Sequence, residues 1–419
     1  MRVSYTPRLV DAEIKELLET MGIVLIEGPK AAGKTETARR LAKTEIKLAT
    51  DENHRILAKV APESLLVGDE PILIDEWQLV PELWAYTKEV VDRSQKKGQF
   101  ILTGSAVPKD DVTRDVNALR VGRLLIRPMS LLETGHSTGK VSLAELFDGA
   151  VPTTTDPGIT LQGIAERVCV GGWPGVQSLT VPRAQKAMKH YISEITGHDV
   201  QIASGINFNK DNVSKVLRSL ARNVGTKVSI KTISADAGGK NTPLHDNTTT
   251  GYLNSLSRVF ITENSPAWTP ELRSKVRVQG QETRYFIDPS LAVAAVGASP
   301  GVLIGGQIKY FGFLFENLVV RDVRCYMQSL FGEVRQYRDE QDREVDIILV
   351  LPDNRWAAIE VKLGVGQVEE AAGDLLAFRE RIDTDAQGFP VFMAVVTATG
   401  PAYERADGIF VIPIGALGP

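Results

Sequence analysis

The most specific chemical signal in the sequence is residues 28–35, Gly-Pro-Lys-Ala-Ala-Gly-Lys-Thr, which match the phosphate-binding pattern G-x-x-x-x-G-K-[ST] at every fixed position. Glycines let the backbone curl so that successive N–H groups face phosphate oxygens. We expect Lys34 to reach the β- and γ-phosphates and the Thr35 hydroxyl to ligate Mg²⁺. An apolar run at 23–26 precedes the loop and a helical pattern through Leu41 follows it, which is the context that the motif requires.

The sequence therefore predicts a site for ATP or ADP with Mg²⁺. The predicted nucleotide-binding residues are Gly28, Pro29, Lys30, Ala31, Ala32, Gly33, Lys34, Thr35 and Glu36.

A second apolar run, residues 72–74, ends in the acid pair Asp75 and Glu76. We expect Asp75 to hold Mg²⁺ through water and Glu76 to orient and deprotonate the attacking water. An acid that can act as a base favours ATP hydrolysis over simple nucleotide storage. The alternative is a strand that merely ends in a solvated acid pair.

A third apolar run, residues 100–102, ends in the hydroxyl residues Thr103 and Ser105. Ligands bind at the carboxyl ends of strands in a doubly wound sheet, so either hydroxyl is placed to sense the γ-phosphate. Ser105 is included in the predicted catalytic set; simple capping of the strand end is the alternative.

Three arginines follow in a polar segment, Arg114, Arg120 and Arg123. Any of them could neutralise charge in the transition state, within the same chain or on a neighbouring subunit. Arg123 is the one placed in the catalytic set, although an individual arginine is more often part of a surface salt bridge.

A second group of charged residues lies near the C-terminus. Asp346 and the pair Glu360 and Lys362 lie on apolar runs separated by a turn, with the spacing D-x₁₃-E-x-K. The turn predicts antiparallel neighbours, and strand alternation puts Glu360 and Lys362 on one face. Glu316 on a preceding helix could complete a metal-binding set of Glu316, Asp346 and Glu360, with Lys362 positioning a metal-activated water as in a Mg²⁺-dependent nuclease. The alternative is a structural salt-bridge cluster without catalysis.

The composition of the chain is that of a globular protein. The 419 residues allow two to three domains at roughly 150 residues each, and 43% are hydrophobic and 24% charged. The 48 basic and 52 acidic residues leave a net charge of −4, so any nucleic-acid surface must be a local patch. The two cysteines, Cys169 and Cys325, match no metal spacing, and no apolar run reaches transmembrane length. We therefore expect a cytoplasmic protein without a membrane partner and with reduced thiols.

The hydrophobic pattern predicts an α/β protein of several parts. A βαβ rhythm over residues 1–135 predicts a parallel sheet covered by helices, of the P-loop NTPase kind. A helical lid or connector follows over 136–208, with a short helix near 143–147 and a Gly-Gly-Trp-Pro-Gly break at 171–175. Residues 209–300 read as a winged-helix-like domain. Residues 305–419 read as a further α/β domain.

The winged-helix expectation depends on the order of the middle elements. Helical patterns at 212–224, 229–237 and 246–257 precede strand-like runs at 258–263 and 274–278.

DNA is a candidate partner through this region and the C-terminal domain. Arg273, Lys275 and Arg277 alternate along one run and could contact phosphates, or they could form a solvated edge. The expected recognition helix, 245–258, offers only Arg258 as a sure cation, which weakens the expectation of DNA binding.

Nearly the whole chain resembles the prokaryotic AAA-type ATPases that carry a C-terminal domain of unknown function, DUF4143. The segments that carry the resemblance are 28–35, 75–78, 102–105, 121–128, 171–174, 285–289, 315–317, 344–346 and 359–363. The resemblance implies an ATPase core, a winged-helix-like middle and a C-terminal domain like the PD-(D/E)xK (restriction-endonuclease-like) fold.

Three functions remain open on this basis. The leading hypothesis is a Mg²⁺-dependent ATPase whose nucleotide state controls a C-terminal nucleic-acid-directed domain. The second is an ATP-regulated protein-interaction scaffold with an inert nuclease-like end. The third is an ATP-dependent DNA nuclease in defence or repair. A homo-oligomer is compatible with each of them.

Overall fold

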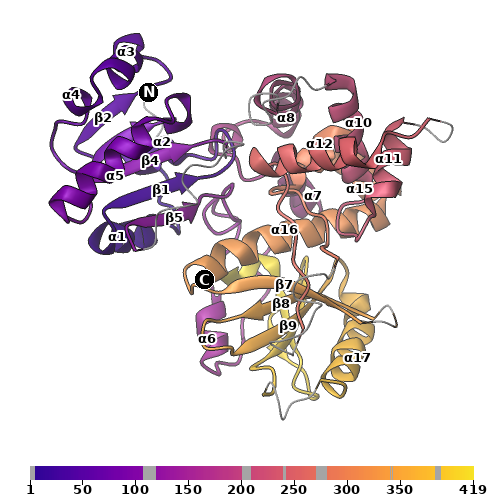
Figure 1. Ribbon diagram of the computed structural model, residues 1–419. Helices are drawn as coiled ribbons and strands as arrows, with labels where there is room; N and C mark the ends of the chain where they lie inside the picture. The colour runs from indigo at the N-terminus through magenta and orange to yellow at the C-terminus, as the bar shows by residue number, and fades with distance from the viewer. Residues whose placement is uncertain are drawn as a thin grey trace.

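The computed structural model describes residues 5–106, 119–200, 209–238, 242–269, 281–339, 341, 343–382 and 388–419. Figure 1 shows a sheet domain at the N-terminal end, a helical part beside it, and a second sheet domain beneath the helical part. The long helix α16 (Ile308–Gln328) runs between the helical part and the second sheet.

The N-terminal domain is a five-stranded parallel sheet in the order β2-β3-β4-β1-β5, which confirms the expected α/β class. Its strands are β1 (Ile23–Glu27), β2 (Thr44–Lys47), β3 (Ile72–Asp75), β4 (Phe100–Gly104) and β5 (Val121–Leu125). Its helices are α1 (Asp11–Thr20), α2 (Lys34–Arg39), α3 (Glu52–Val60), α4 (Pro62–Leu65) and α5 (Leu83–Ser94).

Apolar residues explain the central strands, whereas the edges were not expected. β4 is buried throughout and β1 is buried except at its last residue, because helices cover both faces of the sheet. β2 and β5 are edge strands with mixed burial, and neither was predicted from its hydrophobic pattern. The helix after the phosphate loop is also shorter than expected, ending at Arg39 and not at Leu41.

The helical part follows the expected order of elements. It contains α7 (Leu161–Val170), α8 (Val181–Glu194), the π-helical turn η3 (Ile195–Asp199), α10 (Lys210–Arg222), α11 (Ile230–Gly238), α12 (Asp246–Arg258), α14 (Pro289–Val296) and α15 (Pro300–Gly306). The strand expected at 258–263 is wrong, because α12 continues through Arg258. Instead, isolated antiparallel bridges join Thr262 to Phe286 and Ser265 to Thr283. The expected strand at 274–278, with Arg273, Lys275 and Arg277, lies outside the described residues.

The C-terminal domain has a six-stranded mixed sheet in the order β11-β12-β10-β9-β8-β7. Its strands are β7 (Glu333–Arg338), β8 (Glu344–Val350), β9 (Trp356–Lys362), β10 (Met393–Thr397), β11 (Tyr403–Glu404) and β12 (Phe410–Pro413), and α17 (Val368–Arg379) connects β9 to β10. β8 and β9 are antiparallel, as the turn between them predicted, and β9 and β10 are parallel.

The connector expected over 136–208 is divided in space. Its first part joins the C-terminal domain, because β6 (Val141–Ser142) pairs with β13 (Leu417–Gly418) and α6 (Leu143–Phe147) lies beside the C-terminal sheet (Figure 1). The Phe147 and Phe392 rings pack edge to face at 5.3 Å. Among the described residues of this connector, those of α7, α8 and η3 belong to the helical part.

Within the described residues, no single helix is long and apolar enough to cross a membrane. One pair of helices, α14 and α15, meets the length and composition test only when joined across an 83° bend. Cys169 and Cys325 are both buried free thiols.

Candidate nucleotide site and C-terminal carboxylate cluster

The phosphate loop leaves the carboxyl end of the buried strand β1 and leads into α2. Two of its glycines are required by geometry. Gly28 has φ 149°, and a Cβ there would lie 2.2 Å from the carbonyl oxygen of Ile126. Gly33 has φ 101°, in the left-handed region that favours glycine. The curled loop predicted from the motif is therefore present.

Lys34 lies inside this loop. Its side chain is buried, and Nζ donates hydrogen bonds to the carbonyl oxygens of Gly28 and Pro29, each at 2.9 Å. Burial lowers the pKa of Lys34 to about 8, although the carboxylates of Glu76 and Asp75 partly oppose the shift. The ammonium is thus held by the loop at a position that a phosphate group can compete for.

The two predicted Mg²⁺ residues, Thr35 in the first turn of α2 and Asp75 at the end of β3, lie together. Asp75 Oδ1 accepts hydrogen bonds from the hydroxyl groups of Thr35, at 2.7 Å, and Thr103, at 2.6 Å. Hydroxyl and carboxylate oxygens are ligands that suit Mg²⁺. Thr35 and Asp75 therefore fit the metal that accompanies a nucleotide, and Thr103 orients the Asp75 carboxylate.

Glu76 is the other acid at the end of β3. Its backbone is left-handed, with φ 57°, and its N–H donates to Thr103 Oγ1 at 3.2 Å. Its Oε2 atom accepts hydrogen bonds from Ser105 Oγ at 2.9 Å and from the Gln78 amide. The structure therefore brings Glu76 and Ser105 together, as the strand ends predicted. Gln78 was not predicted to belong to the site, although an amide two residues after an acid is a signal that could have found it.

Among the remaining predicted nucleotide-binding residues, Lys30 and Glu36 have exposed side chains. The Lys30 carbonyl accepts a hydrogen bond from Tyr191 of α8 at 3.1 Å, and the Lys30 side chain is exposed. The Glu36 side chain is exposed and pairs with Arg39. The left-handed φ of Ala31, 63°, completes the curl of the loop.

The two described candidate arginines, Arg120 and Arg123, form ion pairs with acids other than Asp75 and Glu76. Arg123 lies on the edge strand β5, and its guanidinium is 3.6 Å from Glu27, the last residue of β1. Arg120 pairs with Asp92 at 2.8 Å. Arg114 lies outside the described residues. An arginine that acts in transfer of the phosphoryl group remains a prediction.

The four charged residues of the C-terminal motif also lie together. The Val361 N–H donates to Asp346 Oδ2 at 2.8 Å, and Lys362 Nζ donates to Glu360 Oε2 at 2.7 Å. Glu316 of α16 accepts a hydrogen bond from the hydroxyl of Tyr285, a buried residue that was not predicted. Glu316, Asp346 and Lys362 line a cavity of about 450 Å³.

Burial dominates the electrostatics of this cluster. Burial and the Asp346 carboxylate raise the pKa of Glu360 to about 8, and burial and the same carboxylate raise the pKa of Glu316 well above its usual value. Among the described residues, no group of three His, Cys, Asp or Glu side chains is arranged to hold a metal ion. Glu316, Asp346 and Glu360 lie close enough to affect one another's pKa, but their use as a metal site remains a prediction.

A buried polar network links the phosphate loop to the other domains. Arg8 donates to the carbonyl oxygens of Ala32, at 2.8 Å, and Arg127, at 2.7 Å, and its Nε donates to Glu133 at 2.9 Å. The Arg8 side chain thus joins the phosphate loop to residues 127–134, which we call the bridging segment. Neither Arg8 nor this segment was predicted from the sequence.

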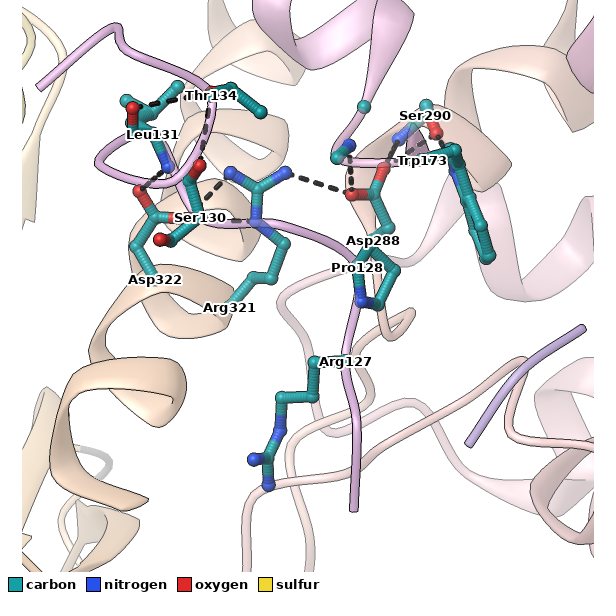
Figure 2. A network of polar contacts seen from close by, with 12 residues as sticks. Arg127, Pro128, Ser130, Leu131, Thr134, Trp173, Asp288, Ser290, Arg321 and Asp322 are labelled. Atoms are coloured by element: carbon teal, nitrogen blue, oxygen red, sulfur yellow. Dashed lines mark hydrogen bonds and ion pairs between the residues drawn. The ribbon is translucent and has the colours of Figure 1, made fainter. Parts of the chain in front are cut away.

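The bridging segment continues the network into α16 and the helical part. Figure 2 shows Asp322 accepting the Leu131 N–H at 2.9 Å, and Arg321 joining Asp322 to Asp288. Asp288 accepts the N–H of Gly172 at 2.9 Å, beside the Gly-Gly-Trp-Pro break. Arg321, Asp322 and Asp288 are all almost completely buried.

Family models cover most of the chain in three pieces. Residues 20–134 match an AAA domain, residues 161–301 match DUF8612, a domain of unknown function, and residues 311–417 match DUF4143, also a domain of unknown function.

Similarity to individual proteins is more limited. Uncharacterized proteins of Mycobacterium bovis and Mycobacterium tuberculosis are 32% identical over 100 residues, which is 23% of this chain and 23% of each relative. The Walker-type ATPase of Pyrococcus abyssi is 15% identical with a TM-score of 0.43, covering 68% of this chain and 94% of that one. Drosophila ORC bound to DNA is 12% identical with a TM-score of 0.20, covering 71% of this chain and 89% of that one.

The domain matches agree with the elements in space, since the AAA match includes the parallel sheet and its phosphate loop, and the DUF4143 match includes the second sheet. The resemblance seen in the sequence is confirmed, and the DUF8612 match adds a middle domain that it did not name. The chain carries an AAA domain at residues 20–134 and a DUF4143 domain at residues 311–417.

Proposed function

We propose that the chain is a Mg²⁺-dependent ATPase whose nucleotide state controls its C-terminal domain. The observation that carries this proposal is the assembly at the ends of β1, β3 and β4. There Lys34, the Thr35–Asp75 pair and Glu76 lie together beside the loop that carries the phosphate-binding motif. Mg²⁺ bound with ATP supplies neutralisation of the charge that develops on the phosphate oxygens.

The roles of the side chains follow from their chemistry. Lys34 leaves the carbonyl groups of its own loop and binds the phosphates. Thr35 and Asp75 supply oxygen ligands for the metal. Glu76 orients a water and accepts its proton at a carboxylate oxygen, and Ser105 keeps that carboxylate in place.

Control of the C-terminal domain is supported by the continuity of the buried network. A change at the Ala32 carbonyl reaches Arg8, then the bridging segment, then Asp322 and Arg321 on α16. The same helix carries Glu316 of the carboxylate cluster. A chain of buried contacts couples two sites when the connecting elements have two discrete arrangements.

A nucleic acid is the proposed target of the C-terminal domain. The order α16-β7-β8-β9-α17-β10, with Asp346 on β8 and Glu360 and Lys362 on β9, supports a PD-(D/E)xK-like fold. The middle domain supports a winged-helix interpretation, since α10, α11 and α12 precede two extended segments joined by antiparallel bridges.

ATP hydrolysis is tested by Glu76→Gln, which keeps the size of the side chain and removes its basicity. We expect ATP to bind normally and kcat to fall by about 10² to 10⁴. Lys34→Ala is the companion variant and should lose tight ATP binding. Unchanged turnover in Glu76→Gln would place the base elsewhere, and unchanged calorimetric ATP affinity in Lys34→Ala would contradict the phosphate-loop assignment.

An ATP-dependent nuclease is the second candidate function, favoured by the gathered cluster of Asp346, Glu360 and Lys362. Cleavage of single- or double-stranded DNA with Mg²⁺ or Mn²⁺ would support it. ATP turnover without cleavage would support control of an inert nucleic-acid-binding domain or a protein-interaction scaffold.

A further inference from the structure

Glu76, the proposed catalytic base, is hydrogen-bonded to Gln78, a residue that has no role in the proposed chemistry. Glu76 Oε2 accepts hydrogen bonds from two donors, the Gln78 amide and, at 2.9 Å, Ser105 Oγ. Gln78 Nε2 also lies 3.3 Å from Ser105 Oγ, so the three side chains form a closed triangle. Both donors therefore converge on one carboxylate oxygen.

The local backbone holds this triangle together. Glu76 is left-handed, and the 3-10 turn η1 (Trp77–Leu79) follows it directly, which turns the Gln78 side chain back toward the acid. Gly104 of β4 leaves the necessary space, because a Cβ there would lie 2.9 Å from Trp77 Nε1 and 3.2 Å from Gln78 Oε1. The position of Gln78 is thus shaped by three neighbouring elements.

In the Gln78 side-chain amide, the nitrogen donates hydrogen bonds and the oxygen accepts none from the described residues. Its Oε1 atom is buried and has no hydrogen-bond partner in the described part of the chain. A buried amide oxygen without a partner is costly, so this arrangement is poised to change when another donor becomes available. Ser105, in contrast, directly follows β4, so the sheet holds its hydroxyl beside the acid.

We propose that Gln78 is a positioning residue that restrains Glu76 in the resting chain, and that its release sets the rate of ATP hydrolysis. Two donors on one oxygen fix the orientation of the carboxylate, so the Glu76 side chain can turn its other oxygen toward an attacking water only after one of these hydrogen bonds is lost. Removing the amide donor leaves Ser105 to orient the acid. This inference rests on the proposed ATP hydrolysis.

The test is the steady-state ATPase rate of the full chain carrying Gln78→Leu, which keeps the bulk of the side chain and removes the donor. We expect kcat to rise about tenfold, the typical effect of one hydrogen bond to a charged group, with KM for ATP and ADP affinity unchanged. Gln78→Ala serves as a second variant should the leucine disturb packing, and melting temperatures verify folding of both.

The matched control is Gln162→Leu. Gln162 donates to Glu166 at 2.9 Å on the exposed surface of α7, so the same substitution removes the same kind of hydrogen bond away from the site. We expect no change in its kcat. Gln78→Leu combined with Glu76→Gln should be as slow as Glu76→Gln alone, because the restraint acts only through the Glu76 carboxylate.

The outcomes separate this inference from the proposed function. An unchanged or lower kcat in both Gln78 variants, with normal ADP affinity, overturns the restraint even when Glu76→Gln is slow. If the parent chain shows no turnover, the Gln78 variants must reveal it, and their silence also overturns the inference. Equal turnover in the parent and Glu76→Gln contradicts the proposed base instead.

Discussion

Lys34 is buried in its own loop, and this burial predicts how nucleotide binding depends on pH. In the nucleotide-free chain the pKa of Lys34 is lowered to about 8. Below this pH the ammonium is charged, and to bind phosphate it needs only to give up its hydrogen bonds to the Gly28 and Pro29 carbonyls. Above that pH the amine is neutral, so binding must take up a proton, and affinity should fall by up to about tenfold per pH unit. Calorimetric ADP affinities between pH 7 and 9.5 measure this decline.

Lys34→Arg provides the comparison for this prediction, because a guanidinium stays charged throughout the range. Whatever its absolute affinity, its ADP binding should be independent of pH from 7 to 9.5. A parent affinity that stays constant up to pH 9.5 would contradict the assignment of the lowered pKa to Lys34.

Single residues differ in how far the sequence could predict them. Lys34, Thr35, Asp75 and Glu76 belong to motifs whose spacing corresponds to the ends of neighbouring parallel strands, so their proximity followed from strand order. Arg8 could not be predicted in this way, because its three partners are brought to it only by the folded bridging segment and loop. The role of Gln78 likewise depends on the left-handed backbone at Glu76.

Elements were predictable where their hydrophobic period is long and regular. α16 (Ile308–Gln328) is the helix expected to carry Glu316, and β9 (Trp356–Lys362) is the strand expected to carry Glu360 and Lys362. β5 was not predicted because an edge strand alternates polar and buried residues over only five positions. The two-residue pairing of β6 with β13 joins residues 141–142 to residues 417–418, which are so far apart in the sequence that no local pattern could reveal it.

The β8–β9 hairpin provides a prediction at the scale of elements. Burial and the Asp346 carboxylate raise the pKa of Glu360 to about 8, so the folded chain retains a proton that the unfolded chain loses above pH 4.5. Stability contributed by this group therefore falls as pH rises from about 5 to 8. Asp346→Asn removes the repelling charge and should reduce that loss, measured as melting temperatures at pH 5.5 and 8.

Metal titration distinguishes the two interpretations of the same hairpin. If Glu316, Asp346 and Glu360 bind a cation, the nucleotide-free parent should bind Mn²⁺ weakly and Asp346→Asn more weakly still. The full chain is required, because β6 and α6 pack on this domain and are absent from residues 305–419. No Mn²⁺ binding at millimolar concentration, with normal folding, would leave a structural cluster in which Lys362 offsets the acids.

At the scale of the whole molecule, partly buried ion pairs connect the domains. Arg127 of the bridging segment pairs with Glu263 at 2.6 Å, and Arg324 of α16 approaches the same carboxylate at 3.6 Å. Burial alone would raise the pKa of Glu263, but the two guanidinium groups outweigh it and lower the pKa to about 2. This pair therefore persists across the physiological pH range, and nucleotide, not pH, is the expected signal between domains.

We expect substitution of Arg321 to weaken the connection between the domains most. Its guanidinium donates to Asp288 at 2.8 Å and to Asp322 at 2.6 Å, and all three side chains are at most 2% exposed. Arg321→Met therefore leaves two buried carboxylates without their cation, which should lower the free energy of unfolding by about 3–5 kcal/mol. We expect calorimetry of the variant to show separate unfolding transitions, with ATP raising only the transition of the AAA domain, whereas ATP should raise every transition of the parent. Arg93→Met, which breaks an exposed pair with Glu89 on α5, should behave like the parent. An Arg321→Met chain that unfolds like the parent and responds to ATP in the same way would show that coupling between the domains does not pass through this network.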